Sequence, residues 1–179
     1  MFALLSACGE PHRQPRIKTP MEPESFLDPL DFLRDLYDGD IRYLLVGRQA
    51  LALLGAPLLS ADYDFYLAPG PESLESLLEL ASTRNLEVSP SSPHDTAFLS
   101  LLSDNLKLDF FHADQYVTKD GEPFTFDELY QRRKVIAVDD FAIYVPALED
   151  LLLTKKTRLS PKDREDIKYI QVLLEREQI

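Results

Sequence analysis

The chain has 179 residues, of which 45% are hydrophobic and 28% charged, and this composition is typical of one globular domain with a sizeable core. Its formal net charge of -12 argues against a protein that wraps nucleic acid through a broad basic surface, although a local basic pocket on an acidic body is compatible with it. The single cysteine, Cys8, excludes an internal disulfide framework and fits a reducing cytoplasm.

Residues 1–24 are predicted to form an extended tail, because prolines alternate with charged residues there. The run Leu5-Ser6-Ala7-Cys8 resembles the cleavage box of a bacterial lipoprotein, but the apolar run before it is short and carries no basic residue, so we interpret it as accidental. Met21 offers a second start of translation. Residues 25–179 are predicted to form a single domain, and no apolar run approaches the length of a membrane-spanning helix.

The first half of the domain alternates helix and strand signals. Asp28-Pro29 is a helix cap followed by a first-turn proline, and apolar residues recur after it at helical spacing up to Gly39. The further elements predicted in this half are a strand at 42–46, a helix from 50 to 55 beyond the Gly47 turn, a strand at 62–67, a helix from 70 to 81 and a short strand at 87–89.

The second half begins with two apolar runs, at 96–102 and 106–112, that flank Ser103-Asp104-Asn105 and predict a hairpin. After a polar connection, the predicted elements are a helix at 126–132, paired strands at 135–138 and 141–145, a helix from 146 to about 156, and a last helix capped by Ser160. The sum is an α/β (α+β) domain with a small mixed sheet and flanking helices, including C-terminal helices.

The run Asp62-Tyr63-Asp64 opens an aromatic-rich strand, where residues two apart point to the same face. Two carboxylates side by side repel each other unless a cation lies between them, and Mg²⁺ prefers such oxygen ligands together with substrate phosphates. Asp109 lies between large apolar residues on a later strand. If the two strands are neighbours, three carboxylates converge and could hold two Mg²⁺ ions, with Gly47 turning backbone N–H groups toward the phosphates.

Val46-Gly47-Arg48 and Asp62-Tyr63-Asp64 resemble the motif of the nucleotidyltransferase superfamily that includes DNA polymerase beta, especially its small bacterial members. That motif is a hydrophobic residue, a glycine, a second small residue and, roughly a dozen residues later, an acid-hydrophobic-acid triplet. Asp109 suits the third acid. The C-terminal part, from Val145-Pro146 through Lys155 to Asp166, looks like the closing helices of minimal nucleotidyltransferases in toxin–antitoxin systems.

The resemblance implies a Mg²⁺-dependent transfer of a nucleoside monophosphate from a nucleoside triphosphate to an acceptor hydroxyl. Asp62, Asp64 and Asp109 are then the catalytic and metal-binding residues. The nucleotide-binding residues are Gly47, Arg48, Ser60 and Lys155. The acceptor is a tRNA end, a protein tyrosine or a small hydroxylated molecule, and an antitoxin or another protein is a candidate partner.

The departures from the motif keep other interpretations open. Arg48 replaces the second small residue, and Leu58 and Ser60 stand where related sequences often carry arginine and threonine. A catalytically inactive binding module on the same fold, or one half of a toxin–antitoxin pair, is therefore the alternative. Lys155 either binds the triphosphate or complements a helix dipole. Asp163 and Asp166 are interpreted as a cap and a solvated face.

Overall fold

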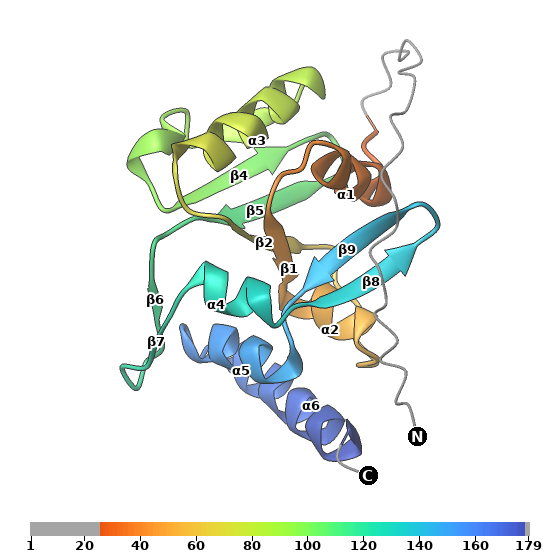
Figure 1. Cartoon of the computed structure of the whole chain (residues 1–179), viewed down its shortest axis with the longest axis vertical. Helices are drawn as coiled ribbons and strands as arrows, with labels where there is room; N and C mark the ends of the chain where they lie inside the picture. The colour runs from red at the N-terminus through yellow and green to blue at the C-terminus, as the bar shows by residue number, and fades with distance from the viewer. Residues whose placement is uncertain (1–25, 178–179) are drawn as a thin grey trace, which may run out of the picture.

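The computed structural model describes residues 26–177 (Figure 1), so the predicted tail at 1–24 lies outside the described residues. The helices are α1 (Pro29–Asp38), α2 (Gly47–Leu53), α3 (Pro71–Thr83), the 3-10 turn η1 (Pro93–Asp95), α4 (Phe126–Gln131), α5 (Leu148–Lys156) and α6 (Pro161–Glu177). The strands are β1 (Tyr43–Val46), β2 (Tyr63–Leu67), β3 (Glu87–Ser89), β4 (Phe98–Leu102), β5 (Lys107–Phe111), β6 (Tyr116–Val117), β7 (Pro123–Phe124), β8 (Lys134–Val138) and β9 (Phe141–Val145).

The central sheet has five strands in the order β1-β2-β5-β4-β3, which confirms the predicted small mixed sheet. β2 and β5 are parallel, and the other neighbours are antiparallel. The predicted β4–β5 hairpin is present, and it brings β5 back beside β2. In this register Asp64 lies opposite Asp109, and Phe65 lies opposite Phe110.

The two central strands present different chemistry on their two faces, because alternate residues of a strand point in opposite directions. Phe65 and Phe110 stack with their ring centroids 4.6 Å apart on one face, and Phe32 of α1 contacts both rings edge-on. All three rings are fully buried. The opposite face carries Asp64 and Asp109, so the aromatic core fixes the strands from which these carboxylates project.

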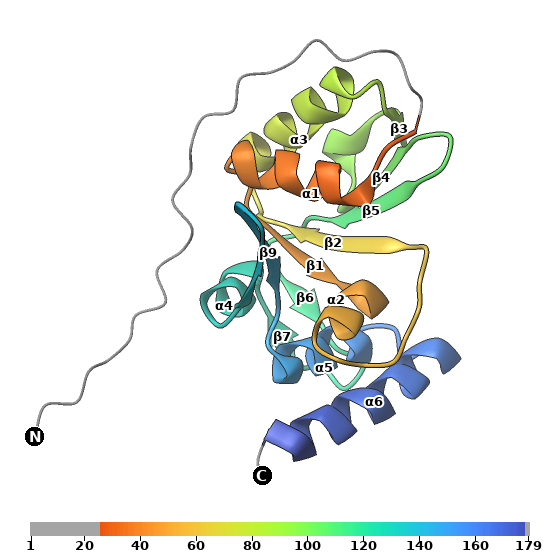
Figure 2. The same cartoon turned by 90° about the vertical axis from the view of Figure 1, so that its right-hand side faces the viewer.

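The helices lie on both sides of the sheet (Figure 2). α1 begins as predicted, with the Asp28 side chain accepting a hydrogen bond from the Leu30 N–H and Pro29 in the first turn. Both views place α5 and α6 together at the end of the molecule opposite α3. In the described part of the chain no helix has both the length and the apolarity needed to cross a membrane.

Two hairpins pack against the central sheet without joining its hydrogen-bonded strand order. β8 and β9 pair as predicted, and β9 is buried along its whole length. The β6–β7 hairpin lies in the segment interpreted from the sequence as a polar connection, and its strands are only two residues long. Its Tyr116 ring stacks on Tyr66 of β2 with centroids 4.3 Å apart, so side-chain packing against the main sheet holds this short hairpin in place.

Candidate functional site

A cavity of about 170 Å³ lies where β1, β2 and the start of α2 face α5 and the following loop. It brings together three of the residues predicted for the nucleotide site, namely Gly47, Asp64 and Lys155. The rest of its wall consists of Val46, Tyr66, Phe111, Tyr116, Val117, Thr154, Thr157, Arg158 and Asp163. The wall therefore combines a glycine turn, a carboxylate, two cations and an aromatic surface.

Gly47 is the first residue of α2 and has a φ of 69°, in the left-handed region that favours glycine. A Cβ at this position would overlap the Asp64 carboxylate oxygen and would lie 3.3 Å from the Asp64 Cβ. Glycine is therefore required both for the backbone turn from β1 into α2 and for the close approach of β2. The position of Asp64 and the conformation of Gly47 depend on each other.

Asp64 projects into the cavity from β2, and within residues 26–177 its carboxylate makes no side-chain hydrogen bond or ion pair. Burial raises the pKa of Asp64, and the negative charges of Asp109 and Asp62 raise it further. The cations Lys155 and Arg158 oppose this rise. A half-buried carboxylate that repels two others and lacks a protein partner is suited to bind a cation.

Asp62 and Asp109 differ from Asp64 in their surroundings. Asp62 precedes β2, is 63% exposed, and has the Lys162 ammonium 3.6 Å from its carboxylate. Asp109 is 17% exposed and holds partners on both oxygens: the Ser100 hydroxyl donates to Oδ1 at 2.5 Å, and the Lys107 ammonium donates to Oδ2 at 2.8 Å. Asp64 and Asp109 thus lie opposite each other on neighbouring strands, and Asp62 lies just before β2. Of these three acids, Asp64 alone lines the cavity, and it alone has no side-chain partner within residues 26–177.

The donor set fits one divalent ion better than two. Asp62 and Asp64 supply the oxygens that Mg²⁺ prefers, and two such carboxylates with substrate phosphates make a usual Mg²⁺ site. Across residues 26–177, however, no group of three or more His, Cys, Asp or Glu side chains is arranged to hold a metal ion. Asp109 lies opposite Asp64, but an ammonium already occupies one of its oxygens and a hydroxyl the other.

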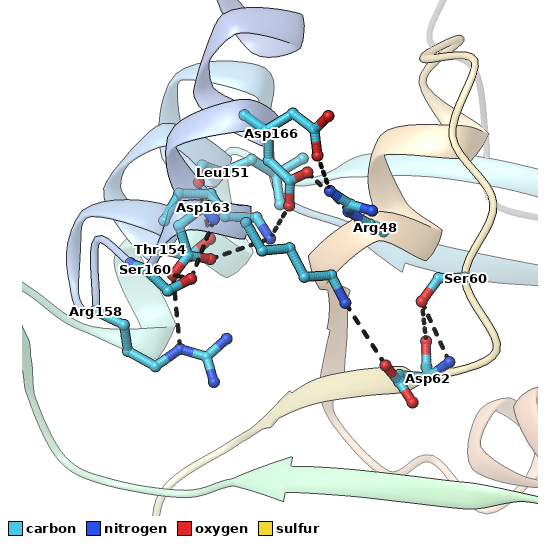
Figure 3. Close-up of polar contacts among 12 residues, drawn as sticks. Arg48, Ser60, Asp62, Leu151, Thr154, Arg158, Ser160, Asp163 and Asp166 are labelled. Atoms are coloured by element: carbon cyan, nitrogen blue, oxygen red, sulfur yellow. Dashed lines mark hydrogen bonds and ion pairs between the residues drawn. The ribbon is translucent and has the colours of Figure 1, made fainter.

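A buried ionic network joins α5 and α6 beside the cavity (Figure 3). The Lys155 ammonium donates to Asp166 Oδ2 at 2.7 Å and lies 3.6 Å from Asp163 Oδ1. On the other side of Asp166, the Arg48 Nε donates to Oδ1 at 2.8 Å. Asp166 is fully buried, with one cation on each oxygen. Ser160 caps α6 as predicted, because its hydroxyl accepts a hydrogen bond from the Asp163 N–H. Burial opposes ionisation of Asp163, but the Ser160 N–H and hydroxyl both donate to its carboxylate and lower its pKa.

Known proteins resemble this chain in their structures. No family model and no curated protein matches the sequence. Among solved structures, the lincomycin-bound lincosamide antibiotic adenylyltransferase LnuA is similar at a TM-score of 0.53 and 16% identity, over 80% of this chain and 92% of that chain. A candidate nucleotidyltransferase from Thermotoga maritima is similar at a TM-score of 0.51 and 19% identity, over 82% and 92% of the two chains.

A third similar structure is an antigenic nucleotidyltransferase-like protein from Paracoccidioides brasiliensis, with a TM-score of 0.50 and 16% identity over 78% of this chain and 72% of that chain. The chain has the nucleotidyltransferase fold. The fold therefore agrees with the resemblance of the Gly47 and Asp62 motifs to this superfamily. The motif residues Gly47 and Asp64 both line the cavity.

Two of the predicted nucleotide-binding residues, Arg48 and Ser60, do not line the cavity. Arg48 was expected to meet the phosphates, but its guanidinium is turned to α6, where it pairs with Glu165 and Asp166 (Figure 3). The buried carboxylate of Asp166 binds the Arg48 guanidinium through a charge-assisted hydrogen bond, which is stronger than the hydrogen bonds that the guanidinium would make to water. Ser60 accepts a hydrogen bond from the Asp62 N–H at 3.2 Å, and so stabilises the turn that leads into β2.

The interpretation of Asp166 as part of a solvated face is wrong, because the residue is fully buried between Arg48 and Lys155. The sequence interpretation also missed Arg158, Thr154 and Thr157 in the cavity wall. The signal for them was the polar run that follows the apolar part of α5. This run combines cations and hydroxyls that can donate hydrogen bonds to phosphate oxygens.

The buried network gives a stability prediction. We expect Asp166→Asn to lower the free energy of unfolding by about 3 kcal/mol, because the substitution removes the charge that pairs with Arg48 and the nearer of the two acids beside the buried Lys155 ammonium. Glu165→Gln is the matched control: it removes the neighbouring acid on the same Arg48, but Glu165 is 58% exposed, so a change of about 0.5 kcal/mol or less is expected. Urea unfolding of the two variants measures the difference, and equal effects would contradict the prediction.

Proposed function

We propose that the protein is a Mg²⁺-dependent nucleotidyltransferase that transfers a nucleoside monophosphate from a nucleoside triphosphate to an acceptor hydroxyl and releases pyrophosphate. The observation that carries this proposal is the cavity in which the Gly47 turn and the unpartnered Asp64 face the cations Lys155 and Arg158. Opposite charges on facing walls suit a ligand with a polyphosphate at one end and a bound cation between them.

Each wall has a separate task in this proposal. Arg158 and Lys155 attract the triphosphate, while the hydroxyls of Thr154 and Thr157 offer neutral hydrogen bonds beside them. Asp166 fixes Lys155 in position through a 2.7 Å hydrogen bond. The Gly47 turn brings backbone close to the phosphates without a side chain in the way. Catalysis of this kind depends mainly on positioning and on stabilising charge in the transition state.

The carboxylates act at the α-phosphorus. Mg²⁺ held by Asp62 and Asp64 would neutralise charge on the phosphates and orient them for in-line attack. The acceptor oxygen forms a bond to the α-phosphorus, the bond from that phosphorus to the pyrophosphate oxygen breaks, and pyrophosphate leaves. Asp109 is assigned to the acceptor hydroxyl and takes its proton as the new bond forms.

A small hydroxylated molecule is the acceptor that we test first. The similar structure LnuA is a lincosamide antibiotic adenylyltransferase. The net charge of -12 makes a polyanionic RNA acceptor less favourable, because like charges repel during encounter. A protein tyrosine and a tRNA end remain the other acceptor classes in the experiment.

The experiment supplies each of the four nucleoside triphosphates, labelled at the α-phosphate, with Mg²⁺ and one acceptor class at a time. Labelled acceptor and released pyrophosphate are measured for the wild type, Asp62→Ala and Asp64→Ala. Asp104→Ala, an exposed acid in the turn between β4 and β5, is the control. Equal labelling by the wild type and the two site variants would remove the assignment, and tight nucleotide binding without transfer would favour the inactive binding module.

Arg158 provides a binding prediction with little effect on folding, because its side chain is 68% exposed. We expect Arg158→Gln to weaken nucleoside triphosphate binding by about tenfold, through loss of a charge-assisted hydrogen bond to phosphate. Isothermal titration with a non-hydrolysable analogue measures this, and Arg164→Gln, an exposed arginine on α6, is the control. An unchanged affinity in Arg158→Gln would place the phosphates elsewhere.

A further inference from the structure

We infer that the Lys107 ammonium takes the place of one of two divalent ions in the metal centre formed by Asp62, Asp64 and Asp109. This centre then binds a single ion, at Asp62 and Asp64. This inference rests on the proposed function and concerns the number of ions in the same site. The two-ion arrangement expected from the sequence requires Asp109 as a ligand. In this chain Asp109 does not fit that role.

The surroundings of Asp109 show why it does not fit. Its two carboxylate oxygens accept hydrogen bonds from the Ser100 hydroxyl at 2.5 Å and the Lys107 ammonium at 2.8 Å. Asp109 is 17% exposed and Lys107 is 53% exposed, so the carboxylate end of this pair is sheltered from solvent while the ammonium end reaches it. A dication placed against the same carboxylate would face the positive charge of Lys107 at close range.

The strand register fixes Lys107 on the carboxylate face. Lys107 and Asp109 are two residues apart on β5 and therefore point to the same side of the sheet. β5 lies parallel to β2 with Asp109 opposite Asp64. The Lys107 ammonium therefore comes from the same strand as Asp109, the third acid. It supplies a positive charge beside Asp109, where the two-ion arrangement would require a second ion.

The charges of the centre balance with one ion. Three carboxylates carry three negative charges, and the Lys107 ammonium together with one divalent cation carries three positive ones. A second divalent cation would leave the protein part of the centre with an excess of two positive charges. Arg158, which is 68% exposed on the opposite wall of the cavity, offers further positive charge to the triphosphate, whereas the charge of Lys155 is already matched by Asp166.

Lys162 does not play the same part as Lys107. Its ammonium lies 3.6 Å from Asp62, and both side chains are more than half exposed. Such an open pair is weak and is screened by solvent and salt, so an incoming ion displaces it at little cost. Lys107 differs because it donates a hydrogen bond to a largely buried acid.

The number of bound ions tests the inference without measuring activity. Mn²⁺ replaces Mg²⁺, and a nucleoside triphosphate analogue with a non-hydrolysable bond between the α- and β-phosphates holds the complex in the ground state. Titration calorimetry counts ions per chain, and electron paramagnetic resonance reports magnetic coupling between ions about 4 Å apart. We expect one uncoupled ion in the wild type and two coupled ions in Lys107→Met.

Two further variants make the result specific. Lys107→Arg keeps the positive charge and is expected to bind one ion, while Lys168→Met removes an exposed lysine on α6 and is expected to behave as the wild type. Two coupled ions in the wild type, or one ion in Lys107→Met, would overturn the inference and leave the proposed function standing. Absence of nucleotide binding in the wild type would instead overturn the proposed function and this inference with it.

Discussion

Asp64→Asn is expected to lower nucleotidyl transfer by about 10³-fold while the protein stays folded. The substitution keeps the size and shape of the side chain but removes the negative charge that would hold the divalent ion. Since Asp64 has no protein partner within residues 26–177, no hydrogen bond or ion pair to the protein is lost. Transfer of labelled nucleotide to the acceptor measures the loss, and circular dichroism verifies the fold.

The same variant is expected to be at least as stable as the wild type at pH 7 in metal-free buffer. Burial and the neighbouring Asp109 raise the pKa of Asp64 above its value in the unfolded chain. The folded protein therefore binds a proton more tightly than the unfolded chain does, and wild-type stability falls as the pH rises through the folded pKa. Asp64→Asn lacks this loss and is expected to melt at a higher temperature than the wild type at pH 7.

The control for both effects is Asp104→Asn, which removes an equal charge from the exposed turn between β4 and β5. It is expected to leave transfer and melting temperature unchanged. Asp64→Asn with wild-type transfer would show that Asp64 holds no required ion. A large drop in its melting temperature would show that the carboxylate has a structural role that its surroundings do not reveal.

Gly47→Ala is expected to lower the free energy of unfolding by about 3 kcal/mol. Two costs contribute. The residue has a φ of 69°, which an L side chain adopts with strain, and the new Cβ would overlap the Asp64 carboxylate. Transfer activity is expected to fall as well, because relief of the overlap moves β2 away from α2.

Gly55→Ala separates the two costs. Gly55 also has a positive φ, of 96°, but a Cβ there would meet no atom within 4 Å. Its loss of stability therefore reports backbone strain alone, and we expect about 1 kcal/mol. Thermal and urea unfolding of both variants give the difference. If Gly47→Ala cost no more than Gly55→Ala, β2 would have to be free to shift, and the tight coupling of Gly47 to Asp64 would be wrong.

Local signals in the sequence were sufficient for most elements of the fold. The Asp28-Pro29 cap, the alternation around Asp64 and the Ser160 capping box each predict an element whose physical cause is contained in a few neighbouring residues, and the structure has all three. The β6–β7 hairpin was missed because two-residue strands have no periodicity to detect. Its stability comes from Tyr116 stacking on Tyr66, a contact between distant parts of the chain.

Site residues that belong to a motif with fixed spacing could be predicted from the sequence. Side-chain directions that depend on contacts between distant segments could not. Gly47 and Asp64 could be identified from their spacing, and both line the cavity. The direction of Arg48 could not, since it depends on a buried acid in α6, far along the sequence. Asp166 itself could have been found: it lies four residues before the buried Ile170 and therefore on the core-facing side of α6.

The parallel pairing of β2 with β5 also has a consequence for folding. Asp64 and Asp109 are brought opposite each other only after α3, β3 and the β4–β5 hairpin have closed the intervening loop, and Lys155 joins them from a later segment still. Loop-closure entropy makes such non-local pairings slow. We therefore expect the cavity to be assembled late during synthesis, when α5 has left the ribosome, so that an incomplete chain carries the acids without a cavity able to bind nucleotide.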